Sequence, residues 1–332
     1  MFSLSVMQCL SRFCVEDLPQ NPLAYGLIAE WEILMRAFFL TVLMTGFVSA
    51  ATAADDPTPK TKIEATDLGS GIYMLTGRGG NMGLSTGADG AFLIDDQYAP
   101  LSSQIKAAIA NLSDTPVRFL INTHWHGDHT GGNESFGDDA AIIVAHENVR
   151  KRLSTDQVLK LWNSQVKASP QIAWPVITFT EEISFHQNGQ RIDVRHVADA
   201  HTDGDAFVYF VEANVLHMGD VFFSGRYPFI DTGSGGSIDG VIAAQKVALA
   251  LVTDDTKIIP GHGALANQAD LVASLAMIET VRERVAKAIA DGMTLEQAQA
   301  ADLLADLNEQ WGGGFINGET MVKIVYGDLA GE

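Results

Sequence analysis

The sequence predicts an α/β fold with β-sheets inside and helices outside. From Ile63 onward, short apolar segments with strand character alternate with longer segments whose apolar residues recur at helical spacing. Residues able to bind metals stand in loops directly beside predicted strands. No interdomain linker and no short repeat follows residue 60, so residues 54–332 are expected to form a single domain.

The elements are predicted in chain order from apolar patterning and turn residues. Asn188-Gly189 is typical of a tight turn between two strands. His146 to Ala168 is expected to be mainly helical, and the C-terminal part is expected to be helical with a break at Trp311-Gly-Gly-Gly314. The other strands are expected at 72–76, 82–86, 91–94, 117–121, 142–145, 206–211, 215–218 and 257–260, a hairpin at 182–197, and helices at 101–112, 237–252 and 271–289.

The N-terminal region is typical of an export signal. Met35-Arg36 supplies a positive start, Ala37 to Val48 is apolar, and Ala51-Thr52-Ala53 matches a cleavage site. A membrane anchor is the alternative, but a spanning helix needs about twenty apolar residues and this core is shorter. We therefore expect residues 35–53 to be a cleaved signal peptide, residues 1–34 to be an over-extension before the true start, and the mature protein to be periplasmic or secreted.

Composition narrows the possible partners. The chain has 21 basic and 41 acidic residues and a formal charge of −20, which disfavours nucleic acid. Both cysteines, Cys9 and Cys14, precede Met35, so the mature protein is expected to have no disulfide and no thiolate ligand. We expect a small-molecule substrate and no stable membrane association after signal cleavage.

The densest chemical motif is Asn122-Thr-His-Trp-His-Gly-Asp-His-Thr-Gly-Gly132, directly after the strand predicted at 117–121. In an extended segment the two histidines of H-x-H point the same way. Imidazole and carboxylate together suit zinc and similar cations. An ordinary polar turn is the alternative, which is disfavoured because these groups are costly to desolvate without a metal. The motif contributes His124, His126, Asp128 and His129.

Three further metal-capable residues, His201, Asp220 and His262, lie in loops beside later strands, and Asp95 follows an earlier one. Blocks of this kind in this order resemble the metallo-β-lactamase fold superfamily over nearly all of residues 63 to 265. The resemblance implies an αββα sandwich of two internal pseudo-repeats, with two zinc ions along one edge of the sheets. It implies that His124, His126 and His201 hold one metal, that Asp128, His129 and His262 hold the other, that Asp220 bridges them, and that Asp95 orients ligands.

Two metals about 3.5–4 Å apart can activate a bridging water and polarise a substrate carbonyl. Asp128 is expected to orient this nucleophile and to receive its proton. No Gly-x-Ser-x-Gly elbow is present. The remaining histidines are expected to be structural or at the surface, and Asp203 and Asp205 are expected to cap a turn, with support of the ligands as the alternative. These histidines are His146, His186, His196 and His217.

The chain resembles secreted β-lactamases in its expected export and in the motif at 122–132. We therefore favour hydrolysis of a β-lactam as its reaction. This chain departs from the best-known subclass of these β-lactamases at two positions. That subclass has a metal-binding cysteine at the position of Asp220. It has a lysine that binds the lactam carboxylate at the position of Phe223. Arg226 could replace that lysine, although a solvated loop arginine is the alternative. A bridging aspartate resembles glyoxalase II-like thioesterases and lactonases, which remain the second hypothesis. Superfamily phosphodiesterases are disfavoured by the acidic surface, and a metal-retaining periplasmic accessory protein stays open.

Two glycine-rich loops, Gly77 to Asn81 and Ser224 to Gly236, are candidate substrate walls. In them, Asn81 and Arg226 are expected to contact substrate, and Tyr227 and Phe229 are expected to offer apolar surface. Solvent turns without a substrate role are the alternative.

Overall fold

The computed structural model describes residues 61–331 of the chain. The predicted over-extension and signal peptide lie outside these residues. Within them, the first sheet has seven strands in the order β1-β2-β3-β4-β5-β6-β9. Its strands are β1 (Glu64–Gly69), β2 (Ile72–Thr76), β3 (Met82–Ser85), β4 (Ala91–Ile94), β5 (Val117–Ile121), β6 (Ile142–His146) and β9 (Ile177–Phe179).

The second sheet has five strands in the order β10-β11-β12-β13-β14 and faces the first. Phe92 and Ile94 of the first sheet share one buried core with Val208 and Phe210 of the second. Removing these side chains from water stabilises the sandwich by roughly 1.5–3 kcal/mol each. The strands are β10 (Glu182–Gln187), β11 (Gln190–His196), β12 (Ala206–Phe210), β13 (Val215–His217) and β14 (Lys257–Ile259).

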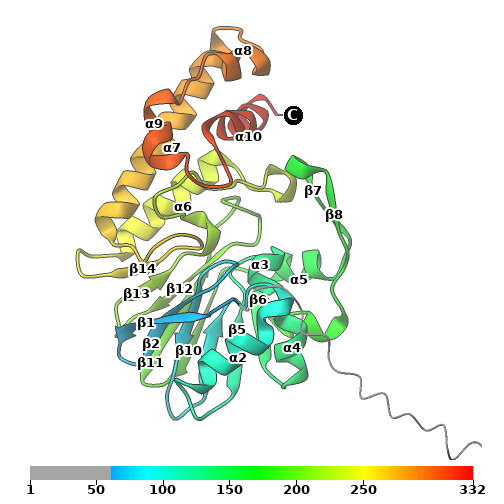
Figure 1. The fold of residues 1–332 in the computed structure, drawn as a ribbon, viewed down its shortest axis with the longest axis vertical. Coiled ribbons are helices and arrows are strands. Elements are labelled where there is room, and N and C mark those ends of the chain that lie inside the picture. Colours follow the sequence, from blue (N-terminus) through cyan, green and yellow to red (C-terminus); the bar gives the residue numbers. More distant parts are fainter. Residues whose placement is uncertain (1–60, 332) are drawn as a thin grey trace, which may run out of the picture. The chain divides into compact units, whose positions relative to one another are not determined.

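Helices cover the outer face of each sheet, which confirms the αββα sandwich (Figure 1). Ile105 and Phe136 pack on the first sheet, and Val241 and Ile278 pack on the second. The helices are α2 (Ser102–Ala110), α3 (Gly127–Thr130), α4 (Asn133–Asp138), α5 (Glu147–Leu153), α6 (Ile238–Leu251), α7 (Gln268–Ala290), α8 (Leu295–Ala300), α9 (Ala305–Trp311) and α10 (Gly318–Ala330). Within residues 61–331, no helix combines the length and the apolar character that a bilayer crossing requires.

The two sheets repeat one topology, as the resemblance implies. In each, antiparallel neighbours are followed by a parallel pair joined through a helix: β4 to β5 through α2, and β13 to β14 through α6. The carboxyl ends of both parallel pairs meet at the same edge of the sandwich. Asp95, the motif at 122–132, Asp220 and His262 all follow these four strands directly.

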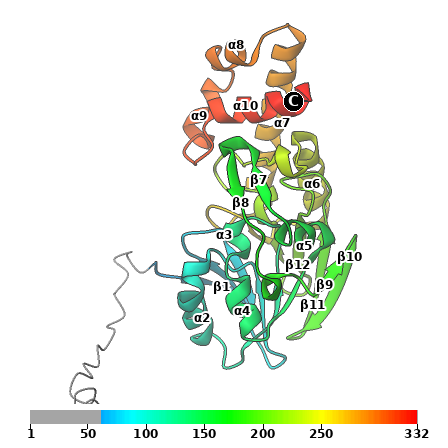
Figure 2. The same cartoon turned by 90° about the vertical axis from the view of Figure 1, so that its right-hand side faces the viewer.

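The prediction of a mainly helical segment from 146 to 168 is wrong. Helix α5 ends at Leu153, because the side chains of Ser154 and Thr155 hydrogen-bond back to the carbonyl of Lys151 instead of continuing the helix. The chain then forms a two-stranded arm, β7 (Gln157–Leu159) and β8 (Ser164–Val166), joined by a 3-10 turn (Lys160–Trp162) and by Asn163 with φ of 47°. The β7–β8 arm extends toward the C-terminal helices (Figure 2). Strand β9 was not predicted, and β1 lies in the region from Ile63 onward that was predicted to be β without strand bounds.

Candidate metal centre

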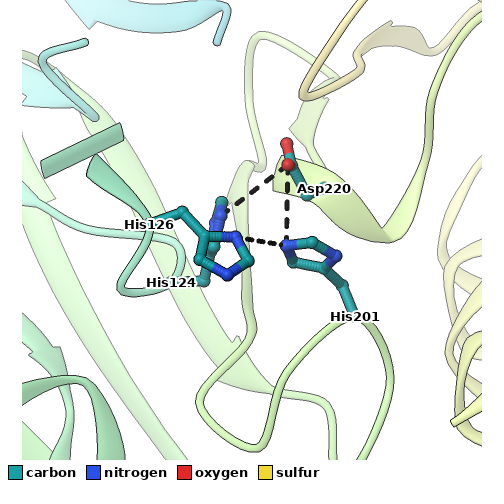
Figure 3. Close-up of side chains that lie close together, drawn as sticks. All are labelled: His124, His126, His201 and Asp220. Atoms are coloured by element: carbon teal, nitrogen blue, oxygen red, sulfur yellow. Dashed lines mark hydrogen bonds and ion pairs between the residues drawn. The ribbon is translucent and has the colours of Figure 1, made fainter. Parts of the chain in front are cut away.

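The seven predicted ligands come together at the edge where the parallel strands end. His124, His126 and His201 with Asp220 form one cluster, in which one ligand atom of each residue lies within 4.8 Å of the others (Figure 3). All four residues are buried. Asp220 Oδ2 lies 3.7 Å from His124 Nε2 and 3.6 Å from His201 Nε2.

Asp128, His129 and His262 form a second cluster beside the first. Asp220 reaches this one as well, because its Oδ1 lies 3.0 Å from His129 Nε2 and its Oδ2 lies 3.5 Å from His262 Nε2. His262 Nε2 is also 3.2 Å from Asp128 Oδ2. The carboxylate of Asp220 therefore stands between two groups of candidate ligands, the position that a bridging residue requires.

Hydrogen bonds on the outer side of the rings fix which nitrogen faces inward. His201 Nδ1 donates to the carbonyl of Phe229 at 2.8 Å, and His126 Nε2 donates to Asp231 Oδ2 at 2.9 Å. The remaining ring nitrogens, His201 Nε2 and His126 Nδ1, then face each other as two acceptors only 2.9 Å apart. Two lone pairs at this distance repel unless a cation lies between or near them.

Asp95 has the same role for the other pair of histidines. Its Oδ2 accepts hydrogen bonds from His129 Nδ1 at 2.7 Å and from the hydroxyl of Thr123 at 2.8 Å. That hydroxyl accepts from His124 Nδ1 at 3.1 Å. Asp95 thus orients two candidate ligands, one directly and one through Thr123, and belongs to neither cluster.

Three buried polar atoms at the cluster edge form no hydrogen bond within the described residues: His124 Nε2, His129 Nε2 and Asp220 Oδ1. The last two lie 3.0 Å apart as an ion pair but do not meet hydrogen-bond geometry. Such atoms cost about 1–3 kcal/mol each when left unsatisfied. Nitrogen and oxygen donors pointing at a common space suit a zinc-like cation. The donor set therefore fits a metal.

The electrostatics of the clusters depend on the shared carboxylate. Burial lowers the pKa of His201 from 6.5 to about 4, so its Nε2 is free of a proton at neutral pH. Burial also disfavours the charged form of His262, but Asp220 and Asp128 outweigh it and raise the pKa of His262 to about 9. The surrounding histidines hold the pKa of Asp220 well below its usual value against the effect of burial.

Two glycines make room for these groups. A Cβ on Gly80 would collide with the ring of His129, and a Cβ on Gly261 would collide with Oδ1 of Asp220. Gly80, in the loop at 77–81 that was predicted to be a substrate wall, thus allows close packing of His129.

A cavity of about 570 Å³ opens above the clusters. Asp128, Asp220, His126 and His262 form part of its wall. Both predicted substrate loops contribute, through Arg78 and through Arg226 and Phe229. The other lining residues are Tyr98, Trp125, Gly127, Leu159, Trp162, Val166 and Phe315.

Two expected substrate residues do not line the cavity. Tyr227 is completely buried and its hydroxyl donates to Asn308 Oδ1, so the expected apolar contact surface is wrong. The side chain of Asn81 is buried and donates to the carbonyls of Pro260 and Gly263. Asn81 therefore holds the loop that carries His262, and its expected contact with substrate is wrong.

The other polar residues have structural surroundings. His217 is buried and contacts the carbonyl of Asn81, while His186 is exposed on β10. His146 caps α5 and stacks on His196 with ring centroids 3.8 Å apart. Asp205 accepts hydrogen bonds from the backbone amides of His201 and Thr202, and Asp203 pairs with Arg152. Asp205 thus caps the turn as expected and also supports a candidate ligand.

Sequence reasoning missed Asp231, Trp162 and Phe315. Asp231 lies in the loop at 224–236, and the backbone amide of Asp231 donates to the carbonyl of His201. The sequence carried one usable signal, an acidic residue next to the apolar Phe229-Ile230 in a loop already suspected of contacting the site. Trp162 and Phe315 come from the β7–β8 arm and from the loop before α10, and nothing in their sequence neighbourhood indicates the cavity.

Comparisons with known proteins agree with this geometry. A profile of the Metallo-beta-lactamase superfamily matches residues 75–262, which is more than half of the chain. Hydroxyacylglutathione hydrolase of Polaromonas sp. (strain JS666) is 25% identical over 194 residues, covering 55% of this chain and 66% of the relative. The alpha subunit of 2,4-dinitroanisole O-demethylase from Nocardioides sp. (strain JS1661) is 28% identical over 141 residues, covering 42% and 40%. The chain thus spans less than two thirds of the length of either relative.

Solved structures show the same fold. A metallo-beta-lactamase from Pontibacter korlensis superposes with a TM-score of 0.54 at 21% identity, covering 66% of this chain and 99% of that chain. A double mutant of the sec-alkyl sulfatase PisA1 superposes with a TM-score of 0.61 at 16% identity, covering 81% and 50%.

Proposed function

Because the chain belongs to the metallo-beta-lactamase superfamily, we propose that it is a hydrolase that holds two zinc ions and opens β-lactam rings. The observation that carries the metal-dependent part is a set of buried ligand atoms in the two clusters that have no hydrogen bond: His124 Nε2, His129 Nε2 and Asp220 Oδ1. Asp220 also lines the cavity. One zinc would be held by His124, His126 and His201 and the other by Asp128, His129 and His262, with Asp220 shared. Zinc ions bound there would polarise the substrate carbonyl and lower the pKa of water.

The residues of the chain supply proton handling and orientation. Burial opposes the ionisation of Asp128, but His129 and His262 outweigh it and lower the pKa of the Asp128 carboxyl, so Asp128 is ionised at neutral pH. Its carboxylate lines the cavity and can accept a proton from an attacking water. Asp95 and Asp231 hold the imidazoles in the orientation that directs their lone pairs inward.

The preference for a β-lactam is supported by the cations in the cavity. Lactam antibiotics carry a carboxylate, and the cavity offers Arg226 and Arg78. Phe223, at the position of the lysine in the best-known subclass, is buried and packs on His262 with ring centroids 4.7 Å apart. Phe223 cannot bind a carboxylate, so we assign the binding of the substrate carboxylate to Arg226. The likeness to metallo-beta-lactamases over nearly the whole of their chains is compatible with this choice.

A second candidate is thioester or lactone hydrolysis. It is favoured by the contact of Asp220 with both clusters, which matches the glyoxalase II-like pattern, and by the hydroxyacylglutathione hydrolases among the relatives. A thiolate leaves readily, whereas the amide nitrogen of a lactam must be stabilised as it leaves. The second metal would therefore matter more for lactams than for thioesters.

A hydrolysis panel on zinc-loaded protein tests both candidates. The panel contains a penicillin, a carbapenem, a glutathione thioester, a lactone and a neutral ester, each measured with and without EDTA. We expect lactam hydrolysis that EDTA abolishes and added zinc restores. Rapid cleavage of thioesters or lactones with every lactam untouched would replace the first proposal by the second. A zinc-loaded protein inert toward the whole panel would instead favour an accessory protein.

A further inference from the structure

Exposed aromatic side chains are concentrated at the cavity. Among residues 61–331, three aromatic side chains are exposed by more than a third: Tyr98 at 41%, Trp162 at 49% and Phe315 at 56%. All three line the cavity above the metal clusters. Exposed aromatic surface is costly in water, and when it gathers at one concave place it marks a binding site.

Trp162 and Phe315, together with the buried Phe229, form a row of aromatic contacts between the two metal clusters. Phe229 stacks on His126 with ring centroids 5.8 Å apart, and Trp162 lies 4.8 Å from Phe229. Trp162 is 6.4 Å from Phe315, which is 6.2 Å from His262. We call Phe229, Trp162 and Phe315 the aromatic wall. It runs without interruption from a candidate ligand of one metal to a candidate ligand of the other.

The wall is assembled from three distant parts of the chain. Trp162 stands at the tip of the β7–β8 arm, Phe229 in the loop after β13, and Phe315 in the loop between α9 and α10. Figure 2 shows the arm extending toward the C-terminal helices. Phe315 is also supported from below by Phe223, with ring centroids 6.0 Å apart. These contacts hold the three rings in place, with Phe229 buried and Trp162 and Phe315 partly exposed to solvent.

The cavity also contains unpaired positive charge. Arg78 and Arg226 are the two arginines in the described part of the chain that form neither an ion pair nor a hydrogen bond. This is unusual in a chain with 41 acidic and 21 basic residues. The stem of Arg226 packs against Gly314, next to Phe315, so one loop supports both the cation and the ring.

We propose that the aromatic wall is a subsite for a planar apolar group of an anionic substrate, whose negative charge is bound by Arg226 and Arg78. A flat ring gains contact with Trp162 and Phe315 at little conformational cost, and the arginines complement the anion. This inference rests on the proposed function in one respect: the ligand of the aromatic wall is taken to be the substrate that reacts at the metal clusters. It adds the substrate class: an amphipathic anion with an aromatic group, in preference to a small aliphatic acid.

Binding of two simple carboxylates tests the subsite without any turnover. The dissociation constants of 3-phenylpropionate and propionate are measured by calorimetry or ligand-observed NMR on zinc-loaded protein. Both ligands carry the same carboxylate, so its binding to the metals or arginines cancels in the ratio of the two dissociation constants. We expect 3-phenylpropionate to bind about tenfold more tightly. Trp162→Ala and Phe315→Ala should each reduce this ratio by about fivefold and leave propionate binding unchanged.

Val158→Ala is the matched control, because Val158 is an exposed apolar residue of the same arm that does not line the cavity. It should leave the ratio unchanged. A ratio near one in the native protein, or a ratio that neither aromatic variant reduces, would overturn the subsite. Because binding is measured, a protein that opens no lactam can still support the aromatic wall, and a lactamase with a ratio near one would contradict it.

Discussion

Asp231 and His126 are joined by a hydrogen bond of 2.9 Å between the carboxylate Oδ2 and ring Nε2, and both residues are buried. The bond leaves the Nδ1 lone pair of His126 facing His201 and Asp220. His126 lowers the pKa of the Asp231 carboxyl despite its burial, so Asp231 is ionised and accepts the proton of the ring. Asp231 thus fixes the tautomer of a candidate ligand from a loop more than a hundred residues away.

Replacing Asp231 tests this role. We expect Asp231→Ala to weaken zinc binding at the first cluster by about 10–100-fold, because the ring of His126 loses its orientation. Titration with a chromophoric chelator measures the affinity, and far-UV circular dichroism checks the fold. Asp239→Ala is the control, since Asp239 is an exposed carboxylate paired with Arg282. Unchanged zinc affinity in Asp231→Ala would contradict the assignment.

Asp220 is predicted to be needed for two metals at once. In Asp220→Ala we expect the zinc content after dialysis to fall from about two equivalents toward one, mainly at the second cluster, and hydrolysis to fall at least ~100-fold. Elemental analysis and initial rates measure the two effects. Asp193→Ala, which removes a half-buried carboxylate of β11 outside both clusters, should change neither. Two retained equivalents with a full rate would show that Asp220 is not shared.

Arg226 is predicted to select anionic substrates. Arg226→Met keeps most of the stem that packs on Gly314 but removes the charge. We expect KM for a carboxylate-bearing substrate to rise about tenfold, with little change for a neutral ester, because one charge-assisted hydrogen bond is lost. Arg282→Met should leave both values unchanged, because Arg282 pairs with Asp239 and does not line the cavity. Equal losses on charged and neutral substrates would assign Arg226 to the structure of the loop alone.

Metal uptake is predicted to release protons near neutral pH. The pKa of His262 in the metal-free protein is raised from 6.5 to about 9, so this ring must lose a proton when it binds a metal. Protonated His262 stabilises the metal-free fold fully below about pH 6.5, and this contribution is lost as the pH rises through about 9. Zinc affinity should therefore increase from pH 7 toward pH 9. Calorimetry in buffers of different ionisation enthalpy should report at least one released proton, and a heat independent of buffer would contradict this.

Export is a further proposal. We expect the mature protein to begin near Ala54, because cleavage after Ala51-Thr52-Ala53 follows the pattern of a signal peptide. Mass spectrometry of the N-terminal peptide from the exported fraction measures this. Recovery of a peptide containing Cys9 or Cys14 would show that the first 34 residues are retained.

The ligand clusters are predictable from the sequence for a physical reason. His124, His126, Asp128 and His129 are close in sequence, and His201, Asp220 and His262 each lie in a loop beside a strand. Because parallel strands present their carboxyl ends at one edge, a strand pattern places most of these loops together. The α/β class, with sheets inside and helices outside, and most of the strands follow from apolar periodicity, whereas the αββα sandwich is predicted from the family resemblance.

The cavity walls are not predictable in this way. Trp162 lies in a segment whose composition suits a helix, and only the side-chain bonds of Ser154 and Thr155 and the left-handed Asn163 turn it into an arm. Phe315 reaches the site through the packing of α9 and α10 on the body of the domain, which local sequence does not encode. The prediction that Tyr227 contacts substrate failed because this aromatic residue, although it lies in a glycine-rich loop, is buried and bonded to Asn308.

The candidate metal ligands come from both sheets, and their separation along the chain affects when during folding they can come together. His126 and His201, in contact in the first cluster, are 75 positions apart, and the carbonyl of Gly263 lies 182 positions from Asn81, whose side chain holds it. Contacts of this separation form late in folding, because the entropy of closing long loops opposes them until both sheets have paired. A cation that binds only the completed edge contributes little to the folding transition state, so it should slow unfolding and leave the refolding rate almost unchanged.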